Sequence, residues 1–400
     1  MTTERLVPLG AAIGLGLLSG FVTALVLFFM TLFEHALWPE QSGPLRIFLT
    51  VMTGGALIAW LRRHEPDATM ESTLDQVYAN ARAALQPAAT LAALGIVSVG
   101  FGGAIGPEAG VLAVIGELSA LVSGYIGRDL QQRRLIGRIG NAGALGALYG
   151  SPPGGASYGE GSAPDAPWPL LVLAALAGLG GFLLANHALP KGAGLAIPMP
   201  PVGRDGEASA LALAVAPALL GAVLGLIHLM MRSGATKMLA LLSNDVRLRV
   251  LAASLIFALL AAFFPIVRFN GQHQLSAAMV DPALAAPAVL MGVSVLKALA
   301  LALCLAGGWL GGPIMPLSFV GAAGGLALAA YAPGLDPGIA VAASVAATAT
   351  VVMKRPLTVL LVLIFLGTNH AVLALTIGVA IGAAALRLTG LEGERDGRHH

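Results

Sequence analysis

The chain has 400 residues, of which 57% are hydrophobic and only 10% are charged, and its mean hydropathy is strongly positive. Such a composition cannot cover a water-facing surface, so it excludes an ordinary soluble protein and predicts a membrane protein. The formal net charge of +2 comes with no basic, aromatic-rich face, which argues against nucleic acid as a partner. The single cysteine, Cys304, excludes an intramolecular disulfide and a cysteine metal cluster.

The N-terminal part predicts two retained membrane helices. Residues 1–5 are poorly shaped for a cleaved signal peptide, and the apolar run 8–33 is too long for its hydrophobic core. We therefore expect 8–33 to be the first membrane helix, followed by a second over 45–60. The charged segment 62–75 is interpreted as a loop that leads into a short helix through Ala84.

A glycine-rich interruption follows the next predicted helix, 87–99. Segment 102–110 contains Pro107 and one carboxylate, Glu108, before an apolar run resumes at 111–118. A carboxylate at the broken start of an intramembrane helix is expensive, so it is a functional hypothesis by default. The alternative is that Glu108 only complements the dipole of its own helix, as a first-turn Glu does in soluble proteins.

The rest of the chain contains a second interruption of the same kind. A polar, Pro/Gly-rich link near the middle divides the sequence into two halves. The remaining first-half elements are a basic segment at 128–138, a small-residue stretch at 141–153 and a long span at 166–188. In the second half, spans are expected at 208–231, 250–267 and 287–306. An interruption at 307–316 then leads into a helix that ends at 329, and further helices are expected at 340–353, 355–366 and 371–387.

The two halves have the same order of features. The distance from Gly106 to Pro152 nearly equals that from Gly312 to Pro356. Paired interruptions at matching places are the sequence signature of a transporter built from repeats, with its site where the broken helices meet. The predicted organisation is a first transmembrane repeat at 1–189, a polar linker at 190–207, a second repeat at 208–390 and a polar disordered tail at 391–400.

Two broken helix starts can hold an anion. A helix start offers free backbone N–H groups and a partial positive charge, and glycines let the backbone approach an ion closely. Pro107 and Pro313 lack N–H groups that would otherwise need partners. A carboxylate on one start competes for the anion's position and can swing away when protonated. This arrangement predicts either proton-coupled anion exchange or a proton-sensitive gate.

These residues carry a family resemblance. Segment 103–108, Gly-Ala-Ile-Gly-Pro-Glu, resembles the glutamate-bearing motif of the CLC family of chloride channels and anion/proton antiporters. Segments 141–153, 296–316 and 355–390 are similar to three further motifs of that family, in the same order. The resemblance covers most of 85–390. It implies an all-α polytopic membrane protein of two inverted-topology helical repeats, with broken helices meeting at the membrane midplane, and a homodimer with one ion pathway per subunit.

The resemblance implies a set of site residues. Glu108 is implied as the gating and proton-coupling residue. The family's central serine motif is absent, and its positional match is Thr69-Met70; some fluoride-exporting members also replace that serine. The implied anion-binding positions are Gly106, Pro107, Ala109, Gly312, Pro313, Ile314, Met315, Thr69 and Met70.

The sequence also departs from the family pattern. The family order Gly-Arg-Glu-Gly-Pro is replaced by Gly-Pro-Glu-Ala-Gly at 106–110, and Ile314 stands where the family has an aromatic residue. The chain ends soon after Gly390, so we expect the family's last helix and its pore-facing tyrosine to be missing. The family's cytoplasmic nucleotide-binding domains are expected to be absent too.

Three further charged residues have predicted roles. Glu160 lies just before the place where proton-coupled relatives carry an inner glutamate, and Glu117 lies deep in the helix that Glu108 opens. Both are candidate proton relays; the alternatives are a loop-end carboxylate and a bond to a neighbouring helix. Lys297, near the start of a span, is expected to extend its ammonium to the membrane interface. The histidines lack metal-ligand spacing, so neither a metal nor a cofactor is predicted.

The sequence therefore favours a transporter of chloride or fluoride that exchanges the anion for protons through Glu108. A passive anion channel gated by Glu108 is the first alternative. A non-transporting membrane scaffold or an intramembrane enzyme is the second, although no convincing second catalytic group accompanies Glu108. The expected location is a prokaryotic inner membrane, with the lipid bilayer, the anion and protons as partners.

Overall fold

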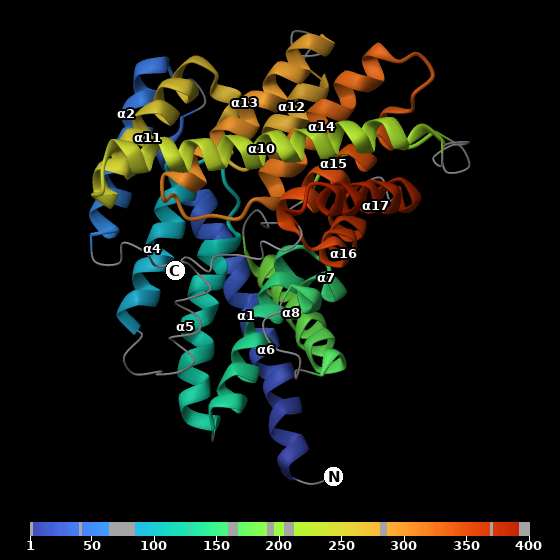
Figure 1. The fold of residues 1–400 in the computed structure, drawn as a ribbon. Coiled ribbons are helices and arrows are strands. Elements are labelled where there is room, and N and C mark those ends of the chain that lie inside the picture. Colours follow the sequence, from blue (N-terminus) through green and yellow to red (C-terminus); the bar gives the residue numbers. More distant parts are fainter. Residues whose placement is uncertain are drawn as a thin grey trace.

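The computed structural model describes residues 3–39, 42–63, 85–127, 129–158, 167–189, 196–203, 212–280, 286–368 and 371–391. Within these ranges the secondary structure is helical apart from two isolated β-bridges (Figure 1). The first half contains α1 (Thr3–Leu37), α2 (Pro44–Leu61), α4 (Leu85–Gly100), α5 (Glu108–Ile126), α6 (Leu130–Leu148), α7 (Pro152–Ser157) and α8 (Trp168–Ala188). The second half contains α10 (Val215–Leu242), α11 (Val246–Phe263), η1 (Pro265–Val267), α12 (Gln272–Val280), α13 (Pro287–Ala306), α14 (Ile314–Tyr331), α15 (Pro337–Met353), α16 (Pro356–Leu366) and α17 (Val372–Leu388).

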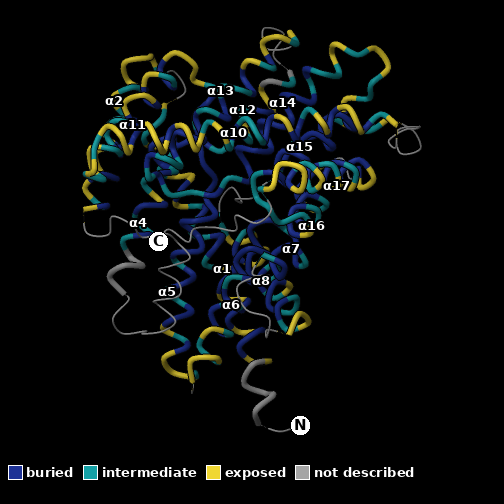
Figure 2. Tube along the Cα trace, in the orientation of Figure 1, coloured by how far each residue is buried: buried dark blue, intermediate teal, exposed yellow. Residues whose placement is uncertain are grey.

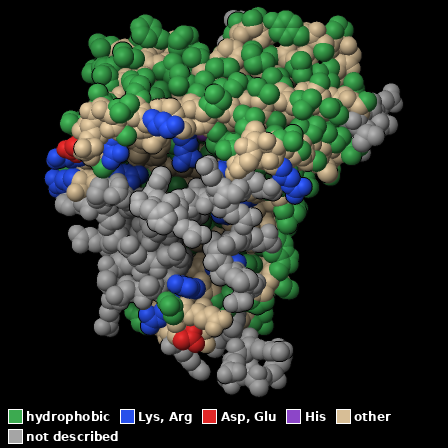
Figure 3. All heavy atoms as spheres, in the orientation of Figure 1, with side chains coloured by type: hydrophobic (Ala, Val, Ile, Leu, Met, Phe, Trp, Pro, Cys, Tyr) green, Lys and Arg blue, Asp and Glu red, His purple; other side chains and the backbone are tan. Residues whose placement is uncertain are grey.

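The outer surface of the helices is suited to lipid. Eight of the described helices are long and apolar enough to cross a membrane: α1, α2, α5, α8, α10, α11, α13 and α14. Large apolar side chains such as Phe29, Met230 and Phe263 are exposed on them, and Figure 3 shows hydrophobic side chains covering much of the face over the second-half helices. Because water would not solvate such a surface, the chain is an integral membrane protein.

Two helices are longer than the hydrophobic pattern predicts. Helix α1 continues beyond residue 33 to Leu37, and α10 continues beyond residue 231 to Leu242. In α10 the added turns carry Arg232 and Lys237, whose side chains are exposed. A helix needs no apolar side chains once it leaves the hydrocarbon, so hydropathy alone places its end too early.

Each half is built around a helix that its neighbours surround. Helix α6 packs against α1, α5 and α8, and α15 packs against α10, α14 and α17. Every residue of α15 from Gly338 to Val351 is buried, as the dark segment in Figure 2 illustrates. Gly143 of α6 lies so close to Gly178 of α8 that a Cβ on Gly178 would collide with the Gly143 carbonyl. Small residues thus permit the close backbone approach on which membrane helix packing relies.

The segment that joins the two halves is partly described. Residues 196–203 lie against the second half: the Ile197 amide donates to the Leu366 carbonyl (2.9 Å), and the Gly203 amide donates to the Asp336 carboxylate (2.8 Å). The other linker residues, and the tail from 392 onward, lie outside the described residues. The predicted boundaries of the two repeats, the linker and the tail stay predictions.

The short helices α7 and α16 bring the two halves together. The Ser151 hydroxyl at the start of α7 donates to the Leu361 carbonyl of α16 (2.7 Å), and it also accepts from the Gly154 amide (3.1 Å). At the start of α16, Arg355 donates to the Tyr158 carbonyl just beyond α7. Both elements begin with a proline at the first helical position, which suits a helix start.

Candidate functional site

The two helix interruptions meet as an antiparallel backbone pair. The Gly106 amide donates to the Gly312 carbonyl (2.7 Å), and the Gly312 amide donates to the Gly106 carbonyl (3.0 Å). Helix α5 begins two residues after Gly106, and α14 begins two residues after Gly312. The N-termini of two helices, one from each half, therefore lie next to the same pair of glycines.

The interruptions have the same internal geometry, offset by 206 residues. Gly102 and Gly308 both have positive φ, at 83° and 79°, a conformation that glycine adopts without strain. The flanking backbone hydrogen bonds repeat in order: Phe101 to Val97 and Gly103 to Ser98 in the first, Gly307 to Leu303 and Trp309 to Cys304 in the second. Glycine is thus required where the backbone turns after α4 and again where it turns after α13.

Both helix starts lack a side-chain cap. The N-cap residues are Pro107 for α5 and Pro313 for α14, and neither makes a capping hydrogen bond. The first amides of a helix have no intrahelical partner, and together with the helix dipole they favour a negative charge. The two starts therefore form an electropositive site without a cationic side chain.

Glu108 places its carboxylate in this site. The residue is 2% exposed, and a Cβ added at Gly106 or at Gly312 would collide with its carboxylate. The carboxylate is directed toward the Gly312 and Met315 amides and the Tyr149 hydroxyl. Neither oxygen completes a hydrogen bond of normal geometry with any described residue. The carboxylate therefore fills the space between the two helix starts.

This arrangement has a direct chemical consequence. A buried carboxylate needs hydrogen-bond donors, and the amides of the two helix starts are the donors that face it. The same donors suit any small anion. Because Gly106 and Gly312 leave room for one such group, the carboxylate and a free anion would compete for the space between them.

Most of the predicted anion-binding residues lie in these two segments. Gly106, Pro107 and Ala109 flank Glu108, and the Gly106–Gly312 pair joins them to the second segment. Four residues form that second segment: Gly312, Pro313, Ile314 and Met315. Ile314 is the counterpart of Glu108 and is buried, as are Met315 and Ala109. The structure therefore brings these residues together, while their role in binding an anion stays a prediction.

Comparison with known proteins identifies the family. The family model described as the voltage-gated chloride channel, Voltage_CLC, matches residues 54–387. The chain belongs to the CLC family. The resemblance found in the sequence is thereby confirmed, and so is the predicted CLC architecture of two helical repeats with broken helices. No curated protein matches the chain.

Three solved structures share the fold. A slow cyanobacterial Cl⁻/H⁺ antiporter matches with a TM-score of 0.74 at 18% identity, covering 96% of this chain and 95% of its own. A CLC-type fluoride/proton antiporter matches with a TM-score of 0.72 at 16% identity, covering 96% of both chains. A eukaryotic CLC transporter matches with a TM-score of 0.68 at 18% identity, covering 96% of this chain and 72% of its own. At these identities the likeness concerns the fold.

Other predicted site residues are less well placed. Thr69, Met70 and Glu160 lie outside the described residues. Glu117 lies nine residues beyond Glu108 in α5, which puts it on the opposite face of the helix and about 13 Å farther along the axis. Glu117 is partly buried, and one of its oxygens has no hydrogen-bond partner among the described residues. Direct contact with Glu108 is excluded, and its role as a relay stays a prediction.

The expectation that Lys297 reaches the membrane interface is wrong. The side chain is fully buried, and its ammonium lies 3.0, 2.8 and 2.7 Å from the carbonyl oxygens of Val267, Arg268 and Phe269. Three acceptors satisfy the charge inside the protein, so it has no reason to reach water. The Phe269 amide in turn donates to the Gly102 carbonyl (3.1 Å), which connects Lys297 to the first interruption.

Aromatic and charged side chains cover the first interruption. The Trp38 indole donates to the Gly100 carbonyl (2.9 Å), and the Arg268 guanidinium lies over the Trp38 ring, 4.5 Å from its centroid. Burial lowers the pKa of Arg268 to about 10, and the nearby Glu34 carboxylate opposes this shift. The guanidinium therefore stays charged at neutral pH, beside the Glu34 carboxylate and the Trp38 ring.

Sequence reasoning missed Tyr149. This residue caps the C-terminal end of α6, is 1% exposed, and directs its hydroxyl toward the Glu108 carboxylate. The available signal was that Tyr149 is the only aromatic residue in the small-residue stretch 141–153.

Among the described residues, no group of three His, Cys, Asp or Glu side chains could hold a metal ion.

Proposed function

We propose that this protein carries a small inorganic anion, chloride or fluoride, across the membrane in exchange for protons. Glu108 is the gate and the proton-coupling residue in this proposal. One observation carries it: the Glu108 carboxylate lies between two uncapped helix starts, in a space that suits an anion. The protein is accordingly proposed to be a transporter and not an enzyme.

The exchange follows from competition for one space. While Glu108 is ionised, its carboxylate occupies the position between Gly106 and Gly312 and blocks the anion. Protonation removes the charge that the two helix starts attract, so the side chain is free to leave and an anion can replace it. Proton uptake by Glu108 is thereby linked to anion occupancy, and this linkage is the basis of the proposed exchange.

The comparisons support this direction. Two of the matching structures are a Cl⁻/H⁺ antiporter and a fluoride/proton antiporter. By analogy we propose a homodimer with one pathway per subunit, located in a prokaryotic inner membrane. In this proposal Gly106, Pro107, Ala109 and the segment 312–315 line the anion position. Thr69 and Met70, which lie outside the described residues, are proposed to take part in anion binding as well.

Flux in liposomes tests the proposal. Purified protein is reconstituted with an anion gradient, and efflux of chloride or fluoride is recorded together with internal pH. We expect the anion gradient to drive protons against their own gradient in the wild type. Glu108→Gln should lose this proton movement. Asp245→Asn, at the exposed start of α11, is the control and should behave as the wild type.

The outcomes separate the alternatives. Equal proton movement by wild type and Glu108→Gln contradicts the coupling role of Glu108. Anion flux without uphill proton movement in the wild type indicates a passive channel with Glu108 as its gate. Absence of any flux favours a non-transporting membrane scaffold.

A further inference from the structure

Tyr149 has a fixed place beside the Glu108 site. Its amide donates to the Leu145 carbonyl (3.0 Å), which keeps it attached to the last turn of α6. Gly143 and Gly146 of the same helix pack closely against α1 and α8, so the end of α6 has little freedom to shift. The next fixed point is Ser151, which bonds to the Leu361 carbonyl of α16. The backbone of Tyr149 is therefore fixed on both sides along the chain.

The Tyr149 hydroxyl lacks a partner in the packed interior. The residue is 1% exposed, and its oxygen makes no hydrogen bond of normal geometry with any described residue. The hydroxyl is directed toward the Glu108 carboxylate, whose two oxygens are also without such bonds. Buried polar groups are normally paired, and each exception requires an explanation. The hydroxyl and the carboxylate face one another, so the Tyr149 oxygen belongs to the same polar site as Glu108.

Packing alone does not explain the oxygen atom. The Tyr149 ring belongs to the large apolar cluster that also contains Val111, Ile314 and Met315. A phenylalanine would fill that volume equally well and would avoid burying an unpaired hydroxyl. The oxygen therefore adds nothing to packing, and its position opposite Glu108 is the feature that remains to be explained.

We propose that the Tyr149 hydroxyl is a hydrogen-bond donor for the transported anion. It donates to the Glu108 carboxylate when that group fills the space between Gly106 and Gly312, and to the anion when Glu108 has left. This inference rests on the proposed anion transport at the same site. A phenolic O–H can donate to a carboxylate or to a halide, which both accept hydrogen bonds. It supplements the amides of the α5 and α14 starts from a third element, α6.

Anion affinity tests this inference in a background without the competing carboxylate. Chloride and fluoride binding to purified Glu108→Ala and to Glu108→Ala/Tyr149→Phe is measured by isothermal titration calorimetry. Loss of one hydrogen bond to a charged group should weaken binding about tenfold. The matched control is Tyr125→Phe in the same background. Tyr125 lies at the far end of α5 and is 90% exposed, so its hydroxyl should not affect affinity.

A second measurement separates binding from folding. In the Glu108→Ala background, where the competing carboxylate is absent, Tyr149→Phe should raise the anion concentration needed for half-maximal flux while the protein elutes as a single species of unchanged thermal stability. A purely structural role predicts the reverse: lower stability with unchanged half-saturation.

The possible results distinguish the two proposals. If Glu108→Ala binds an anion and the double variant binds it equally well, the role of Tyr149 is overturned while anion transport stands. If Glu108→Ala binds neither anion and the wild type shows no flux, both proposals fail.

Discussion

The two interrupted helices have the same backbone and different side chains. Gly106 and Gly312 pair reciprocally, and each precedes a proline and an uncapped helix start. At the first position of the helix, however, the first half has Glu108 and the second has Ile314. The backbone that suits an anion is therefore duplicated, while the group that can take up a proton occurs once. In the proposed function, both halves therefore contribute to anion binding, and Glu108 of the first half alone acts as the gate.

The surroundings of the two interruptions also differ. Near the first, the Gly100 carbonyl accepts a hydrogen bond from the Trp38 indole (2.9 Å). Near the second, the Gly308 carbonyl accepts two from the Arg62 guanidinium (3.2 and 2.9 Å). A turn leaves carbonyl groups that must be paired, and each half pairs them with its own side chains. The two halves thus share a backbone conformation at the interruptions, while different side chains, Trp38 and Arg62, pair the carbonyl groups there.

The largest expected difference between the halves is in the loss of stability on substitution at Lys297 and at Leu91. Leu91 lies 206 residues earlier, is the first-half counterpart of Lys297, and is 2% exposed. Lys297→Met removes the donor to three carbonyls, two of them in buried hydrogen bonds, so we expect a loss of stability of about 3 kcal/mol or more. Leu91→Met keeps the volume and should cost below about 1.5 kcal/mol. Thermal unfolding in detergent measures both, and equal effects would contradict the structural role of the Lys297 ammonium.

The next largest effect concerns the paired glycines. A methyl group on either Gly106 or Gly312 would enter the space that the Glu108 carboxylate fills. Because that space is shared by both halves, Gly106→Ala and Gly312→Ala should each lower anion flux at least about tenfold, a change equivalent to roughly 1.4 kcal/mol. Gly124→Ala is the control, since nothing lies within 4 Å of its added Cβ. Normal flux in either glycine variant would show that the site does not include both halves.

A smaller difference is expected between the N-caps of α6 and α15. The Asp129 carboxylate accepts from the Gln132 amide (2.8 Å), and Asp336 accepts from the Ile339 amide (3.0 Å). Asp336 also accepts from Gly203 in the segment that joins the halves (2.8 Å). We expect Asp129→Ala to cost about 1 kcal/mol and Asp336→Ala about 2 kcal/mol, compared by thermal unfolding. The opposite order would mean that the joining segment gains nothing from Asp336.

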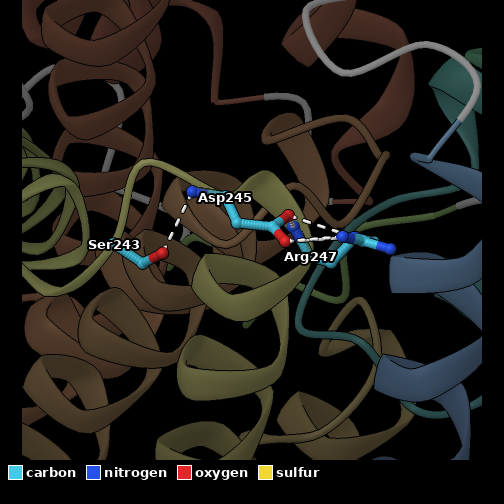
Figure 4. A network of polar contacts seen from close by, with 3 residues as sticks. All are labelled: Ser243, Asp245 and Arg247. Carbon is cyan, nitrogen blue, oxygen red and sulfur yellow. Dashed lines mark hydrogen bonds and ion pairs between the residues drawn. The ribbon is translucent and has the colours of Figure 1, made fainter.

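The smallest effect is expected at the start of α11, where Asp245 accepts from the Arg247 amide and pairs with its guanidinium (2.7 Å), as Figure 4 shows. The counterpart helix α2 has Gly43 there and no side-chain cap. Hydrogen bonds from Arg247 lower the pKa of Asp245, so its contribution is present above the unfolded-state pKa and is lost as pH falls through the lowered folded-state value. The pair is exposed and screened by solvent.

We therefore expect Asp245→Asn to leave the melting temperature at neutral pH almost unchanged, measured with Ser243→Ala as a neighbouring control. A drop of several degrees in Asp245→Asn alone would show that this exposed cap contributes more than its surroundings suggest.

The sequence was informative wherever the chemistry is local. Glycine and proline at 102–110 and 307–316 mark breaks because backbone conformation depends on those residues themselves. The same pattern in both halves predicted that the breaks would meet, and the Gly106–Gly312 pair agrees with this expectation. The family and the helical architecture were predicted correctly for the same reason.

What could not be predicted depends on partners distant in sequence. The three carbonyls that bind Lys297 come from a turn about 30 residues earlier, and hydropathy does not indicate them. Tyr149 reaches Glu108 only because α6 folds back along α5. The sequence predicts the end of α10 too early because polar residues between Arg232 and Lys237 interrupt its apolar pattern, although the helix continues to Leu242. Each case needs the tertiary arrangement, which composition and periodicity do not contain.

The central claim is that the Glu108 carboxylate and the transported anion occupy the same space. Chloride and fluoride affinities of the wild type and of Glu108→Ala, titrated side by side at a pH where Glu108 is ionised, test it most directly. We predict tighter binding of the transported anion by Glu108→Ala, because the carboxylate no longer fills the space between Gly106 and Gly312. Equal affinities in the two proteins would place the anion elsewhere and contradict the account.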